Sequence, residues 1–154
     1  MLFSQDWSYL SSTPLARGVL KSAYEDFQVV ELMDEPFSGQ GEHQLLLVQK
    51  WGVNTEEVAK SIARLIQKPV KIISYAGLKD RQALTTQWFS IHLPGETIEG
   101  IESLIGTNWK VIQATRHHKK LKIGHLAGNQ FRITLREVSN VDDAIARIAT
   151  VDQT

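Results

Sequence analysis

Short apolar runs separated by polar turns dominate this chain, and most of these runs are too short to form helices. Residues 27–31 and 43–50, for example, are rich in Val, Leu and aromatic side chains. Runs of this length that are β-branched, aromatic or partly alternating are typical of strands. The pattern predicts strands at 18–21, 27–31, 43–50, 70–75, 88–91, 109–115 and 130–137, with turns at 24–26 and 38–41.

Three other segments repeat apolar residues at helical spacing. The first begins at Asn54, a good N-cap, with Glu57 at the capping-box position, and Pro69 ends it. The second is stopped by Gly106, and the third starts at residues 140–143. Their apolar faces comprise Val58, Ile62, Leu65 and Ile66 in the first, Ile98, Ile101, Leu104 and Ile105 in the second, and Ile145 and Ile148 in the third.

The order of these elements indicates the fold class. Strands outnumber helices and do not alternate with them one for one, which favours an α+β fold over a doubly wound one. We expect a largely antiparallel or mixed sheet with helices on one face. The length of 154 residues suits a single domain with a real core. Residues 1–16, which carry the scattered aromatics Phe3, Trp7 and Tyr9, are expected to form an irregular arm.

Composition narrows the function classes. The chain has 17 Lys and Arg and 17 Asp and Glu, so its formal net charge is zero. This balance argues against a broadly basic nucleic-acid coat protein, although a local basic patch is enough for RNA binding. There is no cysteine, hence no disulfide framework and no thiolate metal site. No apolar run reaches the length of a membrane span, so a cytoplasmic protein is the default expectation.

The sequence contains no motif typical of a metal-dependent enzyme or a hydrolase. The five histidines show no zinc-binding spacing, and the adjacent His117 and His118 would point to opposite faces of a strand. No Ser/His/Asp pattern is present. The adjacent carboxylates of Glu25 and Asp26 would not converge on one glycosidic bond without help from the fold. We therefore expect no metal site.

The densest basic run lies at residues 116–122. A charge run is usually a solvated face, but it can also bind phosphate groups, and both interpretations remain open from the residues alone. The candidate phosphate-binding residues are Arg116, Lys119, Lys120 and Lys122.

One loop combines features that suit a catalytic site. Asp80 lies in a glycine-containing loop between two predicted strands, with Lys79 and Arg81 on either side. Loops held between rigid strands commonly carry chemistry, and two flanking cations would favour the ionised carboxylate. The alternative is a plain turn whose Asp caps a short helix, and spacing alone favours that alternative.

Three segments in order match one known family. Residues 76–87 read AGLKDRQALTTQ and resemble the G-x-K-D-x-x-A-x-T-x-Q signature of the TruD-type tRNA pseudouridine synthases. Residues 21–31 read KSAYEDFQVVE and resemble the K-x-x-x-E-D-F-x-V-x-E motif of that family. Residues 128–136 read GNQFRITLR and resemble its G-N-x-F-x-I-x-L-R motif. The resemblance extends from about Leu20 to the end of the chain.

The resemblance implies a reaction and a set of roles. Such enzymes break the N-glycosidic bond of a uridine, turn the freed uracil and rejoin it to the ribose through carbon, without a metal or redox cofactor. Asp80 falls at the catalytic carboxylate, acting as nucleophile or as base. Lys21 matches the cation beside it, and Phe131 would stack on the uracil. Asn129 would bond near the ribose or base, Phe27 would form a pocket wall, and Lys79 is a further candidate for substrate binding.

The resemblance also implies a larger enzyme and a tRNA partner. Family members continue past the position of Thr154, so we expect residues 1–154 to be an N-terminal portion of the catalytic domain. The implied activity is isomerisation of a uridine in the D-arm region of tRNA, at position 13. The alternatives are a catalytically incomplete RNA-binding fragment and, with less support, a protein-interaction domain. Self-association through an exposed sheet edge also remains open.

Overall fold

The computed structural model describes residues 12–34 and 36–152, so Phe3, Trp7 and Tyr9 of the expected arm lie outside the described residues. The chain divides into two compact units. We call residues 21–134 the sheet unit, and residues 1–20 with 135–154 the terminal unit.

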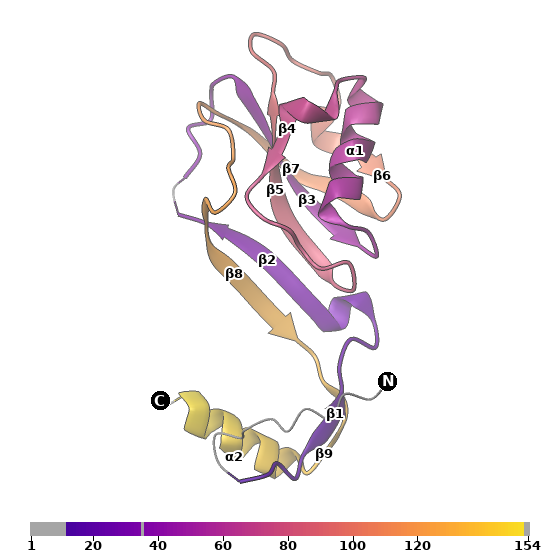
Figure 1. Cartoon of the computed structure of the whole chain (residues 1–154), viewed down its shortest axis with the longest axis vertical. Coiled ribbons are helices and arrows are strands. Elements are labelled where there is room, and N and C mark those ends of the chain that lie inside the picture. The colour runs from indigo at the N-terminus through magenta and orange to yellow at the C-terminus, as the bar shows by residue number, and fades with distance from the viewer. Residues whose placement is uncertain (1–11, 35, 153–154) are drawn as a thin grey trace. The chain divides into compact units, whose positions relative to one another are not determined.

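A seven-stranded sheet forms the centre of the sheet unit (Figure 1). Its order is β6-β7-β3-β5-β2-β8, and β4 also pairs with β5. All neighbours are antiparallel except β2 and β5, which are parallel. The strands are β2 (Phe27–Met33), β3 (His43–Trp51), β4 (Ile73–Tyr75), β5 (Leu84–His92), β6 (Ile105–Gly106), β7 (Trp109–His117) and β8 (Leu126–Ile133).

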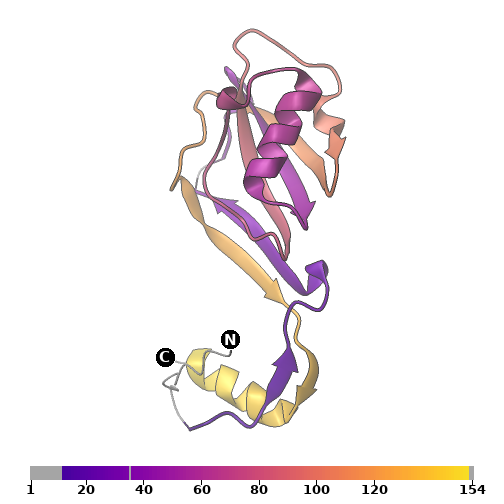
Figure 2. The ribbon, with the colours of Figure 1, turned by 45° about the vertical axis from the view of Figure 1, so that its right-hand side comes forward.

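Helix α1 (Thr55–Ile66) covers one face of this sheet, which is visible in Figure 2. Asn54 is its N-cap and forms the expected capping box with Glu57. The helix ends at Gln67, whose left-handed backbone (φ 56°) forms the C-cap two residues before Pro69. Its buried side chains recur at helical spacing and pack against the apolar residues of β3, β5 and β7. The core residues on this face include Val58, Ile62, Ile66, Leu46, Val48, Phe89, Ile91 and Trp109.

The opposite face of the sheet has a smaller core. Leu45 of β3, Trp88 of β5 and Leu121 are buried together there. Leu121 lies in the connection between β7 and β8, and its backbone N–H donates to the Ser90 hydroxyl at 3.0 Å. Strand β5 is therefore covered on both faces, which explains why its residues 85–91 are all buried.

The predicted fold class, α+β with a mixed sheet, is confirmed. The strands expected at 27–31, 43–50, 88–91 and 109–115 are present with extensions of a few residues. The run at 70–75 is only half strand, because Val70–Ile72 forms a 3-10 turn and β4 begins at Ile73. The turn expected at 24–26 is the short 3-10 helix Tyr24–Asp26.

The helix predicted around residues 98–105 is wrong. Gly100 adopts a left-handed conformation (φ 75°), which interrupts any helix there, and only Ile101–Ser103 forms a 3-10 turn. Ile105 and Gly106 instead pair with β7. The helical spacing was misleading because Ile98, Ile101 and Leu104 face the core from an irregular segment.

The terminal unit contains β1 (Arg17–Val19), β9 (Arg136–Ser139) and α2 (Val141–Asp152). Strands β1 and β9 pair antiparallel. The strand expected at 18–21 is present in part as β1, which ends at Val19. The strand expected at 130–137 is two strands, since β8 ends at Ile133 and β9 starts at Arg136. The helix predicted after Asn140 is confirmed as α2. Among the described residues, no helix is both long and apolar enough to cross a membrane.

Candidate active site

The loop between β4 and β5, residues 76–83, rests on a fully buried lysine. Lys50 of β3 is 0% exposed, and its Nζ donates to the carbonyl oxygens of Val53 (3.0 Å), Lys79 (3.1 Å) and Asp80 (2.9 Å). An ammonium group has three N–H donors, and all three are used. Burial lowers the pKa of Lys50 to about 8, although the charge of Asp80 acts in the opposite direction.

A second set of buried polar groups fixes the start of the loop. Thr55 Oγ1 accepts from the Lys79 backbone N–H at 3.0 Å and donates to Gln87 Oε1 at 2.7 Å. Gln87 Nε2 in turn donates to the Gly77 carbonyl at 2.9 Å. Thr55 and Gln87 are almost fully buried. Hydrogen bonds of this kind hold the backbone of a loop in one conformation, because breaking any of them leaves a buried polar group without a partner.

Lys79 forms a buried ion pair within this support. Its Nζ lies 3.1 Å from Glu31 Oε2, and the two side chains are 5% and 0% exposed. The other oxygen of Glu31 accepts from the Trp88 backbone N–H at 3.1 Å. Glu31 therefore joins the loop to β2 and β5, and this contact directs the Lys79 ammonium inwards. Its predicted role in substrate binding stays a prediction.

Asp80 itself points outwards. Its side chain is 61% exposed, and Oδ2 lies 3.5 Å from Lys21 Nζ. Lys21 has a left-handed backbone (φ 59°), and its Nζ also lies 4.3 Å from the centre of the Phe27 ring. A cation over an aromatic face is attracted to the ring, so Phe27 helps to direct Lys21 towards the carboxylate. The sequence-predicted pair of Asp80 and Lys21 is thus brought together.

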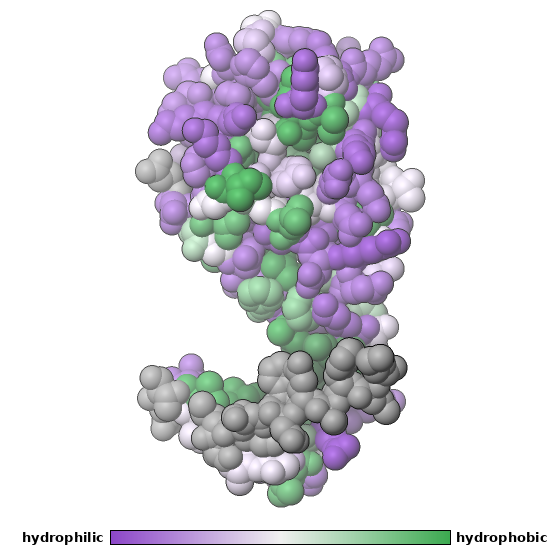
Figure 3. Space-filling model, viewed as in Figure 1, coloured by the Kyte–Doolittle hydropathy of each residue, from purple (hydrophilic) through white to green (hydrophobic). Residues whose placement is uncertain are grey.

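The aromatic and amide candidates line the adjoining strands. Phe131 and Asn129 of β8 lie opposite Val29 and Glu31 of β2, so they share the face on which Phe27 lies. The Phe27 and Phe131 rings meet edge to face with their centres 6.0 Å apart, and Phe131 is 55% exposed. An accessible ring beside the Lys21–Asp80 pair is a suitable surface for a flat base. Hydrophobic groups are visible on this part of the sheet unit in Figure 3.

The basic run divides into two kinds of residue. Arg116 is partly buried, and its guanidinium donates to the carbonyl oxygens of Gly41, Leu93 and Glu96. It therefore ties loops together at the end of the sheet. The side chains of Lys119, Lys120 and Lys122 are exposed, and Lys119 and Lys120 line a cavity of about 320 Å³.

Comparison with known proteins settles the family. The family model described as tRNA pseudouridine synthase D (TruD) matches residues 6–154. The chain belongs to the TruD family. It is 55% identical over 150 residues to the tRNA pseudouridine synthase D of Legionella pneumophila (strain Corby), covering 97% of this chain and 44% of that protein. It is 43% identical over 148 residues to the same enzyme of Pectobacterium atrosepticum, covering 96% and 42%.

A solved structure gives the same answer. A Methanosarcina mazei protein, described as a candidate TruD enzyme, superposes with a TM-score of 0.72 at 31% identity, covering 87% of this chain and 33% of that one. The chain thus spans less than half of the length of these TruD relatives.

Four supporting residues of this candidate site were not singled out from the sequence. Glu31 and Gln87 lie within the quoted family motifs, but a motif does not say which side chains turn inwards. Thr55 looked like an ordinary first residue of a helix. For Lys50 a signal did exist, because it follows the apolar run Leu45–Val48 in a strand that is buried on both sides.

Proposed function

We propose that this chain forms part of the catalytic domain of a cytoplasmic tRNA pseudouridine synthase, which isomerises a uridine at position 13 in the D-arm region. The observation that carries the proposal is an exposed carboxylate, Asp80, on a loop whose backbone is fixed by buried side chains. Catalytic groups need this combination of an accessible reacting atom and a rigid mount. The names of its TruD relatives support the assignment of tRNA as substrate.

Asp80 would act on the ribose. As a nucleophile it would attack the anomeric carbon while the bond to uracil N1 breaks; as a base it would remove a proton from the neighbouring ribose carbon. The uracil then turns and its C5 bonds to the anomeric carbon. In the nucleophile route the bond to Asp80 breaks at this point, in the base route Asp80 returns the proton to the ribose carbon, and in both the C5 hydrogen leaves as a proton. Lys21, whose Nζ lies 3.5 Å from Oδ2, would orient the Asp80 carboxylate.

The base needs a surface on which it can turn. Phe131 would provide it, since stacking on a ring tolerates rotation of the base in its own plane. Phe27 would close one side, and Asn129 would bond to the base or ribose. Lys79 would fix the loop through Glu31 and contribute to substrate binding from this position. Lys119, Lys120 and Lys122 would attract tRNA phosphates.

A catalytically incomplete RNA-binding fragment is the second candidate. One observation favours it: β8 is an edge strand of the sheet, and its Phe131 and Ile133 are about half exposed. A base stacked on an open sheet edge would remain in contact with water and be poorly positioned. Poor positioning can raise the activation free energy by roughly several kcal/mol. In this case the chain would bind tRNA without turning it over.

One experiment separates the two candidates. Tritium release from tRNA labelled at uridine C5 measures turnover, because the C5 hydrogen leaves in the reaction. The 154-residue chain is compared with a chimera that continues into the remainder of the Legionella relative. Turnover by the chimera alone supports a partial catalytic domain, and turnover by both places the whole site in this chain. A folded chimera that binds tRNA but releases no tritium would overturn the enzyme proposal.

A further inference from the structure

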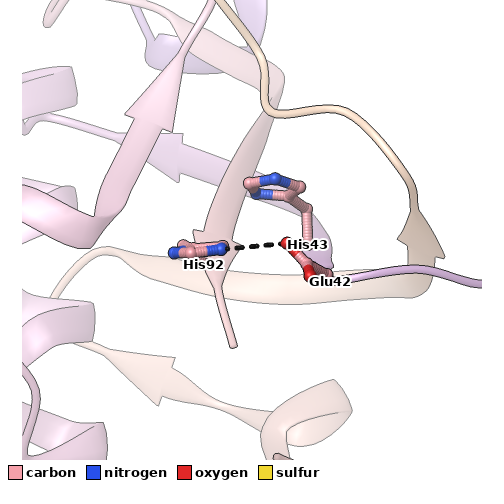
Figure 4. Close-up of side chains that lie close together, drawn as sticks. All are labelled: Glu42, His43 and His92. Atoms are coloured by element: carbon pink, nitrogen blue, oxygen red, sulfur yellow. Dashed lines mark hydrogen bonds and ion pairs between the residues drawn. The ribbon is translucent and has the colours of Figure 1, made fainter. Parts of the chain in front are cut away.

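A second cluster of reactive side chains lies at the far end of β5 from the Asp80 loop. His43 begins β3 and His92 ends β5, and the two residues are direct cross-strand partners. Glu42 precedes β3. One ligand atom from each of these three residues lies within 4.8 Å of the others (Figure 4). We propose that Glu42, His43 and His92 bind a divalent transition-metal ion of the Zn²⁺ type.

The distances are close to those that a metal ion requires. His92 Nε2 and Glu42 Oε2 are already 3.3 Å apart. Two ligands of a tetrahedral zinc ion, with bonds of about 2.0–2.1 Å, are separated by about 3.3 Å. The His43 and His92 rings are stacked at 26° with their centres 4.8 Å apart, so both rings must rotate before their in-plane nitrogen lone pairs can meet at one ion. Two histidines and one carboxylate leave a further position for water.

The state of His43 supports ligation. Its Nδ1 is buried and has no hydrogen-bond partner among the described residues, which is costly for a ring nitrogen unless something binds it. The third histidine nearby, His117, is engaged elsewhere, because its Nδ1 accepts from the Ser38 backbone N–H at 3.0 Å.

Two lysines oppose the cation. Lys71 and Lys120 line the same cavity of about 340 Å³ as the two histidines. Both side chains are exposed, so each can turn its ammonium towards water when a metal ion binds. The same lysines would strengthen an anion site at this place, and this opposite effect makes the two kinds of ligand easy to distinguish.

The site is separate from the proposed catalytic loop, although Lys120, a candidate for tRNA phosphate binding, lines the same cavity. From Leu84 to His92, β5 extends for about 26 Å at about 3.3 Å per residue, which places the cluster well away from the Asp80 loop. Glu42 and His43 are adjacent in sequence, but His92 is remote from them, so the sequence contains no metal-binding spacing motif here. Only the pairing of β3 with β5 brings His92 next to His43. A bound ion would join these two strands and stabilise the sheet.

The test is calorimetric titration of the 154-residue chain with ZnCl₂ in a non-coordinating buffer, together with Co²⁺ absorption spectra. We expect one ion per chain, and a loss of affinity of about tenfold or more in His43→Gln and in His92→Gln. His125→Gln, an exposed histidine outside the cluster, is the matched control and should bind like the parent. Added Zn²⁺ should also raise the melting temperature of the parent but not of the two variants.

Charge variants provide the decisive comparison. Glu42→Gln should weaken Zn²⁺ binding, whereas Lys120→Gln should strengthen it. If the cavity instead binds inorganic phosphate, Glu42→Gln should strengthen phosphate binding and Lys120→Gln should weaken it. The proposal is overturned by that reversal, by the absence of saturable Zn²⁺ binding at millimolar concentration, or by equal affinity in His43→Gln, His92→Gln and the parent.

Discussion

Lys50 Nζ donates to the main-chain carbonyl of Asp80 at 2.9 Å, so a buried cation lies directly beneath the exposed carboxylate of the site. The bond is to the backbone of Asp80, while the Asp80 side chain reaches Lys21 on the surface. Lys50 thus fixes the backbone of Asp80, and Lys21 contacts its carboxylate. These separate roles lead to separate predictions.

Lys50→Met should destabilise the fold and impair the loop. It leaves the three carbonyls of Val53, Lys79 and Asp80 without their donor, and each buried unsatisfied group costs about 1–3 kcal/mol. We expect the free energy of unfolding, measured in urea, to fall by at least about 1–3 kcal/mol. Lys110→Met, an exposed lysine on β7, is the control and should change it little. An unchanged stability in Lys50→Met would mean that these bonds contribute nothing.

The same lysine predicts a dependence of stability on pH. Folding lowers the pKa of Lys50 from 10.5 to about 8, so between these values the unfolded chain holds a proton that the folded chain has released. Stability from this group therefore rises with pH across the window and is lowest below pH 8. The stability difference between the parent and Lys50→Met should widen by about 1–2 kcal/mol from pH 7.5 to 9.5. A constant difference would contradict the lowered pKa.

Asp80→Asn should abolish turnover in the active form of the enzyme. The substitution keeps the size of the side chain but removes its charge and nucleophilicity, so tritium release should fall by about three orders of magnitude or more. Asp142→Asn, an exposed carboxylate in the first turn of α2, is the matched control. If the Asp80 variant kept a tenth of the parental rate, Asp80 would not be the catalytic group.

Lys21→Met should change activity more than stability. The ion pair with Asp80 is partly exposed, so its loss should alter the free energy of unfolding by less than about 1 kcal/mol. Without Lys21 the Asp80 carboxylate loses the contact that directs it, so kcat/KM for tritium release from tRNA should fall. Lys60→Met, which removes an exposed ion-paired lysine on α1, should leave kcat/KM unchanged. An unchanged kcat/KM in Lys21→Met would remove Lys21 from the site.

Phe131→Ala should weaken binding of the target base. Stacking on an aromatic ring contributes about 1–3 kcal/mol per base, and the half-exposed ring has little packing to lose. We expect the loss in kcat/KM on tRNA, while the free energy of unfolding falls less. Ile133→Ala removes a similarly exposed apolar side chain from the same face of β8 and serves as the control. Equal losses in both variants would indicate a general apolar contact in place of stacking.

Local patterns in the sequence predicted the elements that depend on local rules. The capping box of Asn54 and Glu57 defined the start of α1, and the apolar runs defined β2, β3, β5 and β7. The segment around Ile98–Ile105 failed because Gly100 can adopt a left-handed conformation that spacing does not reveal. The order of strands, including the parallel pair of β2 and β5, depends on long-range packing and was beyond the sequence patterns.

The candidate site divides in the same way. The motifs identified Asp80, Lys21 and Phe131, since they are linear signatures that the resemblance could locate. The buried support was not identified, because neither the motifs nor the start of a helix shows which side chains turn inwards, and at Lys50 the preceding apolar run was the only signal. The Glu42–His43–His92 cluster likewise exists only through strand pairing.

The position of β5 in the sheet has a consequence for local opening. Strand β5 pairs with β2 and β4 on one side and β3 on the other, so its amides should be among the last to exchange with deuterium, while those of the edge strand β8 exchange early. The Asp80 loop leads directly into β5. Local opening of β8 would thus displace Phe131, the proposed stacking surface, while β5 and the adjoining Asp80 loop keep their structure.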